Sequence, residues 1–201
     1  PLSVSWGDGR SISDAKLVFK LNGLDLSEYG AFLGPDVAGG LVQGEMVVSS
    51  TESGRHVAVD LAAAGEQMRV RRAGQMLEDL GFRLRSAVSL DDHTRVRINE
   101  AEFRLLHTGR TAVVVELGGG LDLRTRAVRL NGGTVAHLRE CNALLPGSGT
   151  TFPDETLMVR LILDAAMTNE VATLREARIL LTPTTRATNQ ITITGQVDCS
   201  K

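Results

Sequence analysis

A chain of 201 residues can form one large domain or two small ones, and an aromatic content of 3% means that its core must be aliphatic. The net charge of −2 excludes a molecule-wide electrostatic footprint for nucleic acid. The longest apolar runs, such as residues 157–166, are interrupted by charged side chains, so no transmembrane helix is expected.

The N-terminal part of the sequence predicts strands and one short helical segment. Residues 14–22 alternate polar and apolar side chains, which is the period-two pattern of a half-buried strand. Residues 24–33 follow as a turn or a short helix. Two more strands are expected at residues 40–50 and 54–61, with a hairpin-like connection between them.

A long helix is expected over residues 61–80. Val70 and Leu77 lie at helical spacing, Asp60 is a suitable N-cap, and Gly81 supplies a C-terminal stop. Such a helix would pack one apolar stripe onto a sheet.

Residues 82–130 predict five short strands separated by turns, and a second, shorter helix is expected over residues 134–145. The last part of the chain contains three more alternating segments. We therefore expect residues 1–146 to form a β-rich body that contains the helix at 61–80, and residues 147–201 to add C-terminal strands that complete the same domain.

No segment has the spacing of a known catalytic or metal-binding motif. The glycine-rich residues 147–151 lack the lysine of a phosphate-binding loop. His137 and Cys141 would share one face of a helix, but two ligands do not make a structural zinc site. We predict no catalytic residue, no cofactor-binding residue and no metal ligand, and therefore a protein that is not an enzyme; an enzyme of unrecognised type is the third functional hypothesis.

Arginines occur in pairs, two residues apart, on predicted strands. The pairs are Arg83 and Arg85, Arg95 and Arg97, and Arg124 and Arg126. Alternate side chains of a strand share a face, so neighbouring strands would present an arginine-lined interaction surface to acidic partner subunits or to a nucleic-acid backbone. The alternative is that nearby glutamates and aspartates neutralise these arginines on a solvent-facing side of the sheet.

Residues 21–30 (LNGLDLSEYG) resemble the N-terminal strand and turn of several structural proteins of bacteriophage tails. The resemblance implies a β-sandwich or barrel subunit that forms rings through edge and loop contacts. It implies no catalytic residue.

Together these patterns predict a mainly β fold, a β-sandwich or partly closed barrel with one or two packed helices. The leading functional hypothesis is a structural subunit of a virion or phage tail, assembled in the host cytoplasm, whose partners are copies of itself and neighbouring structural subunits. Trp6, Ile191 and Ile193 are candidates for inter-subunit contacts. Nucleic acid is a possible but not a favoured partner, and no membrane is expected.

The alternative hypothesis is a monomeric, exported protein-binding module. In that case the only two cysteines, Cys141 and Cys199, would form a disulfide, because disulfides persist in oxidising compartments. As free thiols, they would instead suit a reducing compartment.

Overall fold

The computed structural model describes residues 14–34, 36–72, 74–145, 151–166, 171–181 and 188–198, and the structural statements below concern these residues. They form one ten-stranded antiparallel sheet in which the strands follow the order of the sequence, β1 to β10. The strands are β1 (Ala15–Asp25), β2 (Val37–Thr51), β3 (His56–Arg72), β4 (Gln75–Asp91), β5 (Arg95–His107), β6 (Arg110–Asp122), β7 (Ala127–His137), β8 (Thr156–Ala166), β9 (Val171–Leu181) and β10 (Gln190–Asp198). Short helices are η1 (Leu26–Tyr29), α1 (Gly30–Leu33), η2 (Glu52–Gly54) and α2 (Leu138–Leu144).

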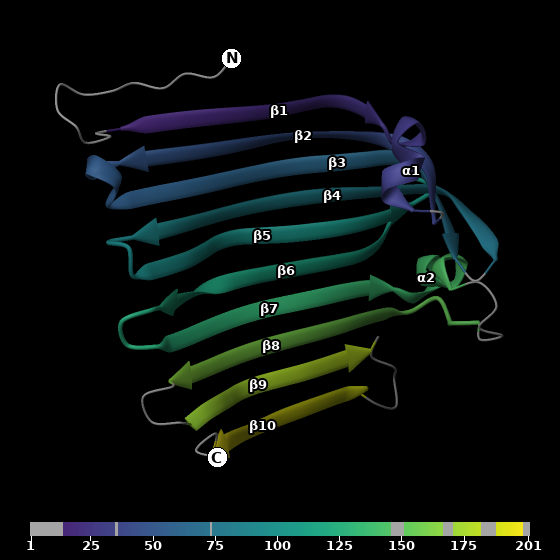
Figure 1. Cartoon of the computed structure of the whole chain (residues 1–201). Coiled ribbons are helices and arrows are strands. Elements are labelled where there is room, and N and C mark those ends of the chain that lie inside the picture. Colours follow the sequence, from purple (N-terminus) through teal and green to yellow (C-terminus); the bar gives the residue numbers. More distant parts are fainter. Residues whose placement is uncertain are drawn as a thin grey trace.

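The mainly β fold class is confirmed. Figure 1 shows the ten strands side by side in one layer, with α1 and α2 at the same end of the strands. The sheet is not closed, because β1 and β10 each pair with only one neighbour. This arrangement agrees with the partly open form of the predicted sandwich or barrel, and α2 packs against it as one of the expected helices.

Tight turns explain why each strand returns beside the previous one. Thr108 and Gly109 join β5 to β6 with φ values of 50° and 76°. Two successive residues with positive φ form the turn whose twist matches that of antiparallel strands. The predicted strands at residues 40–50 and 54–61 are likewise joined by the short helix η2, as expected of a hairpin-like connection.

The long helix predicted for residues 61–80 is wrong. This segment forms the end of β3 and the start of β4, joined by a turn in which Gly74 has φ 79°. Val70 and Leu77 are direct cross-strand partners, so their seven-residue spacing reflects a shared face of a hairpin. The segment pairs with strands on both sides, and these ladder hydrogen bonds outweigh local helical preference.

The second predicted helix and the five-strand run need smaller corrections. Helix α2 begins only at Leu138, because residues 134–137 belong to β7 and pair with β8. Residues 82–130 contain parts of four strands, since residues 123–126 form a turn that separates β6 from β7. The short helical segment expected at residues 24–33 is present as η1 and α1.

One end of the sheet bends. Register shifts cross β2, β3 and β4 at the same level, and Gly40, Gln67 and Asp79 there have positive φ values of 140°, 52° and 53°. Such bulges bend a strand and increase its twist. Figure 1 shows the ends of these strands turning toward α2.

The bend creates the main buried cluster. Leu80, Ala112 and Leu144 form it, joining β4, β6 and α2. Partly buried side chains pack around it: Met68, Val70, Leu77, Leu105, Val113 and Cys141. The tip of the β3–β4 hairpin is therefore fastened to α2 by aliphatic contacts.

Candidate functional site

The register of the sheet sorts its side chains onto two faces of opposite character. Directly paired residues, and every second residue along a strand, share a face. One row of direct partners crosses the sheet from β1 to β8: Leu17, Val48, Val59, Val88, Ile98, Gly119, Leu130 and Leu163. In β9 and β10 the same face carries Ile179, Ile191 and Ile193. We call this side of the sheet the apolar face.

The opposite side, the polar face, carries the charged side chains. Lys20 pairs with Glu45 at 2.9 Å, and Arg104 pairs with Glu102 at 2.7 Å. The hydrogen bond from Arg104 lowers the pKa of Glu102. Because most of these pairs are solvent-exposed, they keep this face hydrated but add little stability.

Among the described residues, nothing covers the middle of the apolar face. Phe19, Leu161 and Ile191 are 47%, 43% and 58% exposed. Within the described ranges, the buried hydrophobic side chains are Leu26, Leu80, Ala112 and Leu144. Nine strand spacings make the face about 43 Å wide, and even the shortest strand, β10 with 9 residues, is about 30 Å long. The area of the face is therefore about 1,300 Å², well beyond the patches of a few hundred Å² usual on monomers. The apolar face is therefore the candidate functional site.

Helix α2 and the tip of the β3–β4 hairpin border the apolar face at one end of the strands. Leu105 and Val113 belong to this face and pack against the buried cluster that contains Leu144 of α2. Helix α2 and the tip of the β3–β4 hairpin thus cover the face at this end of the strands. At the opposite end of the strands, Figure 1 shows the turns that join β4 to β5 and β6 to β7, and the short helix η2 between β2 and β3. The apolar face is thus bordered at one end of the strands and open over its middle among the described residues.

The structure places four of the six predicted arginines on adjacent strands. Arg83 and Arg85 lie on β4, and Arg95 and Arg97 lie on β5. A bulge between Ala87 and Val88 shifts the alternation of β5 by one residue, which brings all four onto the polar face. The expected neutralisation is present in part: Arg95 lies 3.7 Å from Asp122, and Arg97 lies 3.3 Å from Asp91.

The prediction that Arg124 and Arg126 lie on a strand is wrong. Both belong to the turn after β6. Asp122 Oδ1 accepts hydrogen bonds from the backbone N–H groups of Arg124 and Thr125, at 2.9 and 3.0 Å. The bond from Thr125 is the main reason why the pKa of Asp122 is lowered. An aspartate turn of this kind ends the strand before the arginines.

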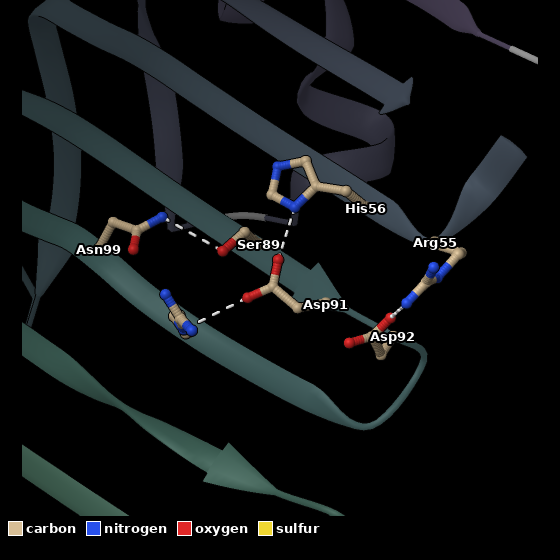
Figure 2. A network of polar contacts seen from close by, with 7 residues as sticks. Arg55, His56, Ser89, Asp91, Asp92 and Asn99 are labelled. Atoms are coloured by element: carbon tan, nitrogen blue, oxygen red, sulfur yellow. Dashed lines mark hydrogen bonds and ion pairs between the residues drawn. The ribbon is translucent and has the colours of Figure 1, made fainter. Parts of the chain in front are cut away.

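A polar network lies where β3, β4 and β5 reach their turns (Figure 2). Asp91 contacts His56 Nδ1 at 2.5 Å, and Arg55 donates to Asp92 at 2.5 and 3.0 Å. This contact lowers the pKa of Asp92 and raises that of Arg55. Ser89 instead accepts a hydrogen bond from Asn99 at 3.4 Å. The network thus links β3, β4 and β5 near their turns.

The remaining sequence candidates are separated by the structure. His137 ends β7, whereas Cys141 lies within α2. The expectation that both residues lie on one helix is therefore wrong. Cys141 is a free thiol that donates to the carbonyl of Ala112 at 3.7 Å, and burial raises its pKa. The described segments contain no group of three residues that could hold a metal ion. Trp6 and Cys199 lie outside the described residues, whereas Ile191 and Ile193 lie on the edge strand β10.

Comparison with known proteins identifies no relative: no family model, no curated protein and no solved structure matches this chain. None of the helices in the described ranges combines the length and the apolar character needed to cross a membrane.

Proposed function

We propose that the chain binds the hydrocarbon chains of amphiphilic molecules, such as fatty acids, along the apolar face. The observation that carries this proposal is the mainly apolar surface that extends across the ten strands, with no described element across its middle. The backbone groups of inner strands are satisfied by the ladder, and the polar side chains described on this face are few, including Ser50, Ser86 and Thr134. A specific polar ligand would need placed donors and acceptors, whereas a hydrocarbon chain needs none.

The dimensions of the apolar face suit such chains. One acyl chain spans about half of a 30 Å bilayer core, roughly 15 Å, so a face about 43 Å wide accommodates two or three chains end to end. A chain lying on an open face loses about half of its contact with water. At about 0.4 kcal/mol per half-buried methylene, fifteen methylenes contribute about 6 kcal/mol. This corresponds to a dissociation constant on the order of 10–100 μM.

A second copy of the chain is the main competitor for the same surface. Two flat sheets pack face to face at about 10 Å. Helix α2 and the β3–β4 hairpin tip rise on the apolar face and oppose that approach at one end. For this reason we favour a small, deformable occupant. Self-assembly into a virion or tail, and the exported binding module, both stay predictions.

Binding of cis-parinaric acid, a fluorescent fatty acid, to the purified chain tests the proposal. The variants Val115→Asp and Leu161→Asp place a charge on the apolar face, where these side chains are 38% and 43% exposed. The control variants Val114→Asp and Ile162→Asp change a neighbouring residue of the same strand, which points to the polar face and is half-buried there. We expect saturable binding that weakens at least about tenfold in the first pair, because a carboxylate resists contact with hydrocarbon, and is unchanged in the controls.

Two results would overturn the proposal. One is the absence of saturable binding together with a dimer in sedimentation that dissociates in Val115→Asp, which would make a second copy the occupant. The other is an equal loss of binding in all four variants with unchanged strand content by circular dichroism, which would mean that the apolar face does not select the ligand.

A further inference from the structure

A gap between two arginines lies on the polar face. Arg97 on β5, Gly120 on β6 and Arg129 on β7 are direct cross-strand partners in one row. Two strand spacings separate the backbones of the two arginines by about 10 Å. Because the middle residue is glycine, no side chain stands between them. We call this gap the arginine slot.

The carboxylate partners of the two arginines lie on the outer sides of the slot. Arg97 contacts Asp91 on β4 at 3.3 Å, and Arg129 contacts Asp164 on β8 at 3.7 Å. Both contacts are made by the Nε atoms, at long distances. A guanidinium has five N–H donors, so each side chain retains donors on its terminal nitrogens. The two side chains are 59% and 81% exposed, which leaves them accessible from solvent.

A third arginine adds donors to the slot. Arg95 lies one row away, and Arg95, Arg97, Gly120 and Arg129 line a hollow of about 510 Å³. The only carboxylate that lines this hollow is Asp122, whose Oδ1 is engaged by the backbone of the next turn. Each of the three guanidinium groups has one carboxylate within 4 Å through its Nε atom, Asp122, Asp91 and Asp164. What the hollow offers is therefore the N–H donors of the terminal nitrogens and not a net positive charge.

We propose that the arginine slot binds a phosphate group, either free or at the end of a small molecule. Guanidinium groups bind phosphate oxygens bidentately, and two opposed groups can grip one phosphate from both sides. A phosphate monoester carries a charge of about −1.5 to −2 at pH 7 and three strong acceptor oxygens, which suit the donors of the terminal guanidinium nitrogens. The arginine slot lies on the polar face, opposite the apolar face, so phosphate binding there does not depend on the binding of hydrocarbon chains.

Nuclear magnetic resonance of the arginine Nε–Hε groups tests the site residue by residue. Inorganic phosphate and phenyl phosphate are titrated at constant ionic strength, with sodium chloride as the reference. We expect saturable shifts of Arg97 and Arg129, and an affinity that is about tenfold weaker in Arg129→Gln, because a charge-assisted contact is lost. The control Arg83→Gln removes an arginine of the same face outside the slot and leaves the affinity unchanged.

Three outcomes would refute the phosphate slot. Shifts that grow without saturation in all arginines, or that chloride reproduces, would indicate general screening. Unchanged affinity in both Arg97→Gln and Arg129→Gln would place binding elsewhere. Acetate binding as tightly as phenyl phosphate would show that the slot does not select phosphate. Amide spectra that keep the wild-type dispersion establish that each variant is folded.

Discussion

Replacing one leucine in the buried cluster and one on the apolar face tests whether that face is open in solution. Leu80 is 8% exposed within the buried cluster, so Leu80→Ala leaves a cavity and should cost about 3 kcal/mol of unfolding free energy. Leu161 is 43% exposed. Its three lost carbons, each worth about 0.8 kcal/mol when fully buried, should therefore cost only about 1.4 kcal/mol, with no cavity to add.

Urea denaturation followed by circular dichroism measures both costs, and equal slopes of the two transitions establish that the same surface is exposed on unfolding. We expect Leu80→Ala to lower the midpoint about twice as far as Leu161→Ala. If both leucines cost the same, the apolar face is covered in solution, and the open single layer does not describe the protein there. The comparison is best made without amphiphiles, since a bound hydrocarbon chain would stabilise the folded state.

Two further predictions concern the backbone and the carboxylates. Gly119 has φ 138°, and a Cβ there would contact the carbonyl oxygen of Arg129 and lie 3.0 Å from Leu130 Cα, so Gly119→Ala should cost about 2–4 kcal/mol in thermal unfolding. Gly109→Ala, with φ 76° and open space around it, should cost about 1 kcal/mol; equal costs would contradict the close approach of β6 and β7. The pKa values of Asp92 and Asp122 are lowered in the folded state. The contribution of these two carboxylates to the free energy of unfolding is therefore complete above about pH 4 and is lost as pH falls through their folded-state pKa values. Urea midpoints between pH 7 and pH 3 should therefore decline, and less steeply in Asp92→Asn; an identical decline in that variant would show that the Arg55 contact is not formed.

The sequence predicted strands well wherever a polar–apolar alternation was bounded by turn residues, as at residues 14–22. It failed at residues 61–80 because Val70 and Leu77 satisfy a helical spacing and also face each other across a hairpin. Sequence spacing alone cannot separate these two arrangements. Arg124 and Arg126 were misplaced for a related reason, since the aspartate turn at Asp122 interrupts an alternation that otherwise looks continuous.

The candidate sites depended more on pairing than on pattern. Arg97 was predicted as part of an arginine surface, but its relation to Arg129 required the register of three strands. The apolar face was implicit in the alternation of every strand, and the sequence interpretation assumed that a second layer would cover it. Ile191 and Ile193 are 58% and 51% exposed, and their role as inter-subunit contacts stays a prediction.

What the amino-acid order determined by itself is local: the two-residue periodicity, the turns, and an aliphatic composition that makes one side of each strand apolar. Tertiary structure alone decided that the apolar sides of the ten strands join into one surface, and that, of the part of the chain that the structure describes, α2 and the β3–β4 hairpin cover this surface at one end. The reason is physical. Alternation fixes which side of a strand avoids water, but only the pairing between distant segments fixes what, if anything, lies against that side.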